Sequence, residues 1–179
     1  MNVDLLQAVR HEIARAPHRF CPAQWAFARN AEAVLRRGAA PQGFRCCIAG
    51  HVLLQSRSCT ERTLLRKGGF HTGGPLWNVA AREAGLSPEQ GRELFFPSQW
   101  DRPFKQKYYL CAREEEAGLA TSYIDHFLTK YAEASLRDRR SICQAEREDD
   151  RTPVGTRSRE GTPVDLTDGG GQPSSQGAV

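Results

Sequence analysis

Glycine and proline interrupt the first three quarters of this chain so often that only short helices fit between them. The interruptions fall at Pro17, Gly38, the glycine cluster 68–74, Gly85, Pro97 and Gly118. Proline disfavours the α conformation in the residue before it, and glycine commonly ends a helix. Between these positions apolar residues recur every three or four residues, which is typical of helices. The sequence therefore predicts a bundle of short helices.

The apolar spacing gives approximate limits for the first elements. Leu5, Leu6, Val9 and Ile13 share one helical face, which predicts a helix over 3–15. Pro22 suits the first position of a short helix, followed by a second helical stretch that stops at Gly38. The run CCIAGHVLL is long and does not alternate, so we expect a buried helix over about 46–56. A further short helix is expected over 60–67, before a glycine loop over 68–74.

The second half of the domain carries clearer start signals. Pro75 opens a helix that ends at Gly85, and Ser87 begins a capping box of the form S-x-x-Q for a helix that reaches Phe96. Asp101 is the candidate N-cap of a helix over 102–116. A last helical stripe follows, formed by Tyr123, Ile124, Phe127, Leu128 and Tyr131. No strand is predicted anywhere.

We therefore predict an all-α fold, a single compact domain of six to eight short helices over 1–134. The remaining residues, 135–179, are first charged and then rich in Gly, Pro, Ser and Thr. Up to about residue 151 this region could form a solvated, fraying helical extension. Beyond it the chain has too few apolar side chains to offset its ordering entropy, so we expect a disordered tail.

Charge and cysteine content narrow the classes of function. Residues 1–132 carry a net charge of +6 and residues 133–179 one of −2, but only four of the 25 basic residues are Lys. This Arg preference suggests a GC-rich genome and makes the positive charge weak support for nucleic-acid binding. The longest apolar stretch, Ile48–Leu54, is too short for a membrane helix, and the N-terminus lacks a secretory apolar region. We expect a cytoplasmic protein with no membrane association, reduced thiols and no metal or cofactor.

Cys47 and His51 are the candidate catalytic residues. A thiol near a helix N-terminus with an imidazole one turn later has the components of a Cys-His nucleophile. Two groups on one helix, however, leave little freedom to place a base and an oxyanion hole around one reacting carbon. Small residues beside a buried histidine are also typical of close helix packing, which is the interpretation we favour.

Nucleic-acid binding is the second alternative, through a helix-turn-helix-like unit over 76–96. Its second helix, PEQGRELFF, carries two glutamates against the single Arg92 and a central glycine, which does not suit contact with phosphates. The next segment interleaves aromatic residues with Arg102, Lys105 and Lys107, a mixture that could stack bases beside phosphates. The aromatic density is also what a buried core requires. We expect any nucleic-acid binding to be weak and nonspecific.

Three stretches of the chain resemble a family of small, largely uncharacterised helical proteins of high-GC bacteria and their phages. They are CCIAGHVLL, VAAREAGLSPEQGRELFFPSQW and YIDHFL. The resemblance covers most of residues 1–132 and rests on a Cys-(Ile/Leu)-Ala-Gly-(His/Trp) motif, a helix ending in A-x-x-LGL, Leu-Phe-x-Pro-x-x-Trp, and a closing helix with I-x-HFL. The matching positions are Cys47, Gly50, His51, Leu94, Phe95, Pro97, Trp100, His126 and Phe127.

The family pattern implies a shared helical fold but no activity that could be transferred. It allows Trp in place of His51, which suits packing better than catalysis. The chain departs from the pattern at Gln42, where members carry a further cysteine, and at Asp101, where they carry proline. The sequence favours a non-enzymatic module that binds a protein partner. The alternatives are a nucleic-acid-associated accessory protein and a Cys-His hydrolase or transferase.

Overall fold

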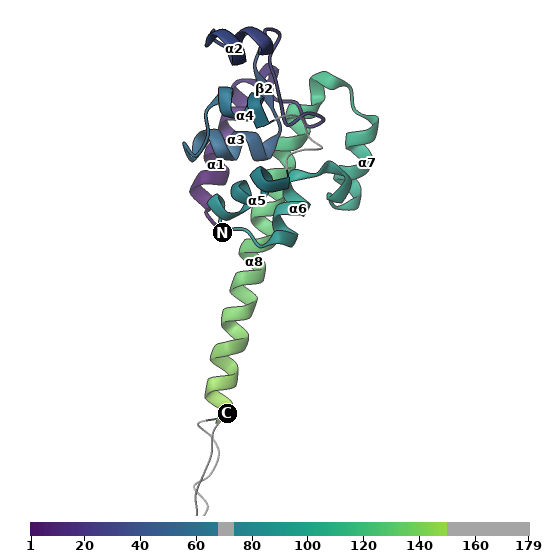
Figure 1. Ribbon diagram of the computed structural model, residues 1–179. Helices are drawn as coiled ribbons and strands as arrows, with labels where there is room; N and C mark the ends of the chain where they lie inside the picture. The colour runs from purple at the N-terminus through teal and green to yellow at the C-terminus, as the bar shows by residue number, and fades with distance from the viewer. Residues whose placement is uncertain (68–73, 150–179) are drawn as a thin grey trace, which may run out of the picture. The chain divides into compact units, whose positions relative to one another are not determined.

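The computed structural model describes residues 1–67 and 74–149, with side chains described for 1–66 and 76–132. The predicted glycine loop, except for Gly74, and the predicted disordered tail beyond residue 149 lie outside the described residues. Within them the protein is all-α, as predicted, with eight α-helices (Figure 1). No helix in this part of the chain is long and apolar enough to span a membrane.

The helices run in chain order with short connections. Their bounds are α1 Val3–Arg15, α2 Ala31–Arg37, α3 Ile48–Gln55, α4 Glu61–Lys67, α5 Gly74–Glu83, α6 Pro88–Phe95, α7 Arg102–Leu110 and α8 Glu116–Asp149. In the described part of the chain, three 3₁₀ turns lie among the connections: η1 Pro17–Arg19, η3 Pro97–Gln99 and η4 Arg113–Glu115.

The first helix is confirmed at the predicted bounds. The side chain of Asn2 accepts a hydrogen bond from the Leu5 N–H and so caps the first turn of α1. Leu6, Val9 and Ile13 are fully buried, as their spacing predicted. Local signals were sufficient here because the cap, the apolar stripe and the terminating Pro17 all agree.

The predicted short helix after Pro22 is wrong, and so is the expectation that the chain has no strand. Residues Ala26–Phe27 (β1) pair antiparallel with Arg45–Cys46 (β2). The N–H of Cys21 also donates to the carbonyl of Cys46 at 3.0 Å. The segment is extended because a distant part of the chain supplies its backbone hydrogen bonds, which helix-forming residue types cannot reveal. Only the second helical stretch forms, as α2, which ends at Gly38 in the left-handed conformation (φ 69°).

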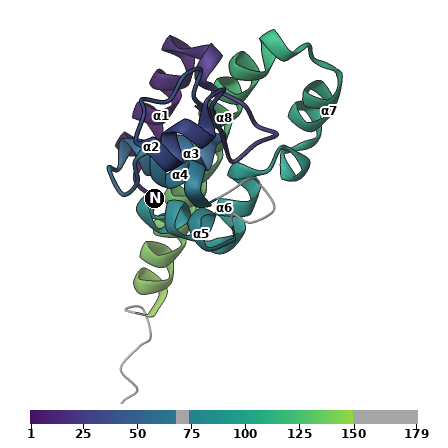
Figure 2. The same ribbon diagram turned by 45° about the horizontal axis from the view of Figure 1, so that its top comes forward.

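Helix α3 lies at the centre of the core, and its first six residues are buried. It contacts both α1 and α5, and α5 contacts α6 (Figure 2). A Cβ atom at Gly50 would lie 2.7 Å from the Cβ of Cys46, so only glycine fits where α3 passes the preceding strand. The predicted buried helix over 46–56 is confirmed except at its start, where Cys46 belongs to β2 and Cys47 is the N-cap.

Helices α5 and α6 meet closely across the turn at Gly85. The capping box of Ser87 and Gln90 is present, with both of its hydrogen bonds. A Cβ at Gly91 would lie 2.9 Å from the Cβ of Ala81 on α5. The central glycine of α6 therefore serves the contact between these two helices.

The predicted helix over 102–116 is interrupted. Helix α7 ends at Leu110, Cys111 and Ala112 are extended, and η4 leads into α8. The Ala112 N–H donates to the Glu115 carboxylate at 3.0 Å, a local cap that starts the new element. Asp101 precedes α7 as predicted, but its side chain makes no capping hydrogen bond.

Residues Met1–Arg139 form one compact unit. Within this unit α8 places Tyr123, Ile124 and Phe127 in the core, as the helical stripe predicted. Arg10 of α1 forms an ion pair with Asp125 of α8 at 2.9 Å. The backbone of α8 is helical through Asp149, so the predicted helical extension of the charged region is present.

Candidate functional site

Cys47 is buried, with 2% of its surface exposed, and so is His51. Burial raises the pKa of the Cys47 thiol to about 11, although backbone N–H groups of Gly50 and Ala49 at the start of α3 act to lower it. The position at a helix N-terminus was predicted to favour the thiolate. The structure shows that loss of solvent outweighs that effect, so the thiol is protonated at neutral pH.

The imidazole of His51 is equally enclosed. Burial lowers its pKa to about 4, and a hydrogen bond to the backbone of Arg19 opposes this only in part. The ring lies 6.2 Å from that of Phe20, and Nε2 has no hydrogen-bond partner in the described part of the chain. Both groups are thus buried in their uncharged forms, an arrangement that suits packing better than nucleophilic catalysis.

The four candidate nucleic-acid-binding residues lie on two different helices. Arg92 lies on α6, where its guanidinium is 3.3 Å from the Glu89 carboxylate. Arg102, Lys105 and Lys107 lie on α7, are exposed, and form no ion pair within the described residues. The second helix of the helix-turn-helix-like unit therefore carries an arginine that is paired with a glutamate, and the three cations of α7 lie outside the unit.

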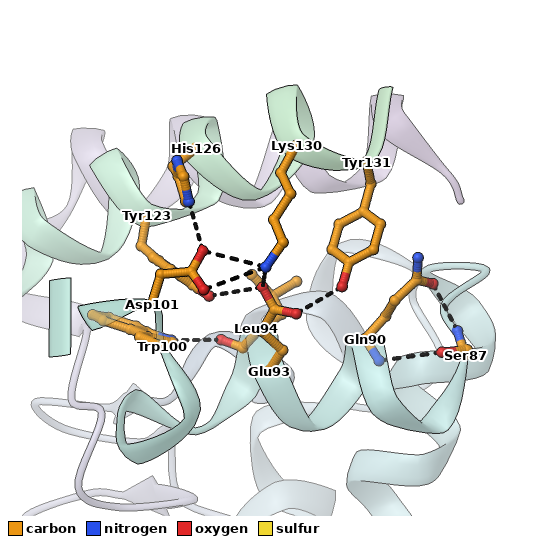
Figure 3. Close-up of polar contacts among 10 residues, drawn as sticks. All are labelled: Ser87, Gln90, Glu93, Leu94, Trp100, Asp101, Tyr123, His126, Lys130 and Tyr131. Atoms are coloured by element: carbon orange, nitrogen blue, oxygen red, sulfur yellow. Dashed lines mark hydrogen bonds and ion pairs between the residues drawn. The ribbon is translucent and has the colours of Figure 1, made fainter. Parts of the chain in front are cut away.

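A network of polar side chains, which the sequence analysis did not predict, joins α6 and the start of α7 to α8 (Figure 3). Glu93 of α6 accepts hydrogen bonds from Lys130 Nζ at 2.7 Å, the Tyr131 hydroxyl at 2.6 Å and the Tyr123 hydroxyl at 3.1 Å. Asp101 lies 2.7 Å from Nε2 of His126 and 3.3 Å from Lys130 Nζ. Lys130 thus bridges two carboxylates.

The electrostatics of this network favour its charged form. The hydrogen bond from His126 lowers the pKa of Asp101, with a smaller contribution from Lys130. Partial burial acts to lower the pKa of Lys130, but the two carboxylates outweigh it and raise that pKa. Burial, with the hydrogen bond to Glu93, raises the pKa of Tyr131 to about 12. Both carboxylates and the ammonium group are paired with other members, so the network joins α8 to α6 and to the residue that precedes α7.

The residues that match the family pattern have structural roles at both ends of this network. The indole N–H of Trp100 donates to the Leu94 carbonyl at 3.2 Å, and its ring stacks on Tyr123 at 4.4 Å. The ring centroid of His126 lies 5.0 Å from that of Phe104, and its Nε2 contacts Asp101. The spacing of His126 and Lys130, one helical turn apart on α8, was the available signal, but their carboxylate partners are far away in sequence.

A groove of about 920 Å³ runs between α7 and the first turns of α8. Its lining is mainly apolar and consists of Pro103, Gln106, Lys107, Leu110, Cys111, Glu115, Gly118, Leu119 and Ser122. Leu110 is 86% exposed and the adjacent Tyr109 is 63% exposed. The other large exposed apolar residues of the described chain are Met1 and Val3 at the N-terminus. The groove is therefore where apolar surface remains uncovered.

Two parts of this groove lack packing partners among the described residues: the surface at Gly118 and one face of α7. A Cβ at Gly118 would meet no atom within 4 Å, although glycine in a helix is less favourable than alanine by about 1 kcal/mol. Helix α7 contains no fully buried residue, and it contacts the core through Phe104 and Tyr108. One face of α7 thus lacks a packing partner among the described residues.

Within residues 1–67 and 74–149, no group of three or more His, Cys, Asp or Glu side chains could hold a metal ion. A second, smaller cleft of about 560 Å³ is lined by Trp77, Phe96 and the outer sides of Glu93 and Asp101, among others.

Comparison with models of known protein families, with curated proteins and with solved structures finds no match. The family resemblance therefore stays a prediction.

Proposed function

We propose that this protein is a non-enzymatic helical module that binds a protein partner through the groove between α7 and α8. The observation that carries this proposal is the exposure of Leu110 at the edge of an apolar groove of about 920 Å³. Exposed apolar grooves of this kind commonly accept an apolar helix face or peptide. An apolar side chain that enters the groove would remove both surfaces from water.

The two alternatives from the sequence have less support. A Cys-His enzyme needs an accessible thiolate, whereas Cys47 is buried and protonated. A DNA reader based on α5 and α6 needs free positive charge on α6, whereas Arg92 is paired with Glu89. No comparable obstacle exists for a partner at α7, where the apolar surface is already exposed.

The test uses the full chain, immobilised at low density, and a display library of random helical peptides. We expect selection of peptides with apolar residues at helical spacing, since such a face matches the groove. Leu110→Asp places a charge at the groove edge and should abolish their binding. Gly118→Leu should also abolish binding, because it fills the floor of the groove without adding a charge.

Val3→Asp is the matched control, since it changes an exposed apolar residue at the other end of the described chain. It should leave peptide binding unchanged. Circular dichroism of each variant verifies that the fold is retained. If no peptide is enriched, or if the enriched peptides bind Leu110→Asp as well as they bind the wild type, the proposal is wrong.

A further inference from the structure

We infer that the partner at the α7–α8 groove is a second copy of this chain, an inference that rests on the proposed function. The hairpin formed by α7, η4 and the start of α8 carries both an exposed apolar projection and an apolar groove. Leu110 and Tyr109 are the projection, and Gly118 with Leu119 forms part of the groove beside them. A two-fold symmetric dimer needs both features on one surface, because each copy must offer what the other receives.

The charges of the hairpin also complement one another. Helix α7 carries Arg102, Lys105 and Lys107, all exposed. The turn that follows carries Arg113, Glu114 and Glu115, also exposed, so two carboxylates stand against one cation there, and both Glu115 and Lys107 line the groove. Two-fold pairing that sets α7 of one copy against η4 of the other would place cations next to carboxylates at two equivalent contacts.

A uniformly acidic partner fits this surface less well. It would pair with the cations of α7, but it would meet Glu114 and Glu115 at the end of the groove. A uniformly basic partner would pair with these glutamates, but the cations of α7 would repel it. The mixed distribution of charge therefore favours a partner with the same arrangement, and the chain itself has it.

The glycine at the floor supports the same occupant. Gly118 has open space above it, and the exposed Leu110 of the same hairpin lines the same groove. In a symmetric pair, Leu110 of each copy would occupy the space above Gly118 of the other. The helical penalty of this glycine would then be offset by burial of a leucine.

Sedimentation equilibrium of the full chain over a range of concentrations is the first test. We expect a reversible monomer–dimer equilibrium. Leu110→Asp should weaken dimerisation by roughly tenfold or more, as expected when an anchoring side chain leaves an interface. Gly118→Leu should weaken it similarly, and Val3→Asp should have no effect. A monomer at every concentration, or equal effects of Leu110→Asp and Val3→Asp, would overturn the inference.

A charge exchange gives a sharper test because it predicts a recovery. Lys105→Glu with Lys107→Glu makes the hairpin acidic, and Glu114→Lys with Glu115→Lys makes it basic. Each double variant alone should be monomeric, since like charges then face each other. An equimolar mixture should dimerise, because every contact again joins opposite charges. Glu115→Gln keeps an oxygen that can accept from Ala112 and so separates the loss of charge from the loss of the local cap.

The two experiments distinguish failure of this inference from failure of the proposed function. Peptide selection that depends on Leu110, in a chain that remains monomeric, overturns self-association alone. A dimer that does not respond to Leu110→Asp, together with no peptide selection, overturns both. Recovery in the mixed sample supports both.

Discussion

At the scale of single residues, close packing explains the motif around Cys47. Gly50 leaves room for Cys46, and His51 is buried on α3 with its ring near that of Phe20, just after η1. The thiol and the imidazole are adjacent in sequence because both belong to the buried start of α3. Their nearness in sequence therefore reflects helix packing and does not indicate a catalytic pair.

His51 makes a specific contribution to the pH dependence of stability. Its pKa falls from 6.5 to about 4 on folding because burial disfavours the charged ring. Between these two pH values the unfolded chain binds more protons than the folded one, so the free energy of unfolding decreases as the pH falls through this range. Below pH 4 the loss should reach about 3 kcal/mol.

Urea denaturation at a series of pH values measures this effect. His51→Phe removes the titrating group, so its free energy of unfolding should vary less between pH 6.5 and 4 than that of the wild type, whatever its absolute value. His18→Gln, a change at an exposed histidine, should keep the wild-type pH dependence. Equal slopes for His51→Phe and the wild type would show that His51 is not the group responsible.

At the scale of elements, α6, α7 and α8 depend on the polar network for their arrangement. Glu93 accepts three hydrogen bonds from α8, whereas the carboxylate of Asp101 can keep His126 when Lys130 is removed. The contribution of each network residue to the free energy of unfolding should therefore depend on how many hydrogen-bond partners its removal leaves unsatisfied.

Glu93→Ala should destabilise the protein by about 2–3 kcal/mol, because it removes this acceptor from two tyrosine hydroxyls and leaves Lys130 with Asp101 alone. Lys130→Ala should cost less, on the order of 1 kcal/mol, because this side chain is partly exposed and its partners can turn to water. Glu89→Ala, on the exposed side of the same helix, should have little effect. Urea denaturation at neutral pH compares the three, and an effect of Lys130→Ala equal to that of Glu93→Ala would contradict this order.

At the scale of the whole molecule, the positive charge of residues 1–132 is dispersed. Several arginines are neutralised in pairs on different helices, such as Arg10 with Asp125, Arg15 with Glu12 and Arg19 with Glu61. The exposed cations of α7 stand beside the glutamates of η4. The ion pairs therefore neutralise part of the positive charge of the described residues.

Binding to DNA should accordingly be weak, indifferent to sequence and steeply reduced by salt. Fluorescence anisotropy with two unrelated labelled duplexes, at about 50 and about 200 mM salt, measures all three properties. Lys105→Ala with Lys107→Ala should weaken the binding at low salt, whereas Arg92→Ala should change it little because Arg92 is paired. Tight binding to one duplex that survives the higher salt would favour the nucleic-acid alternative over the interaction module.

The sequence by itself determined the elements whose signals are local. The bounds of α1, the capping box of α6, the end of α2 at Gly38 and the buried stripe of α8 all follow from residues within a few positions of one another. Caps, helix-terminating glycines and apolar spacing act over one or two turns of chain, so they can be recognised without the fold.

Only the tertiary structure decided the features that need distant partners. The strands β1 and β2 form because residues 26–27 meet residues 45–46, and Asp101 leaves its capping role because His126 and Lys130 lie beside it. The groove exists because α7 ends at Leu110 and turns back toward α8. Hydrogen bonds and burial between residues far apart in sequence depend on how the helices pack. The pattern of residue types along the chain does not show which distant residues come close in space.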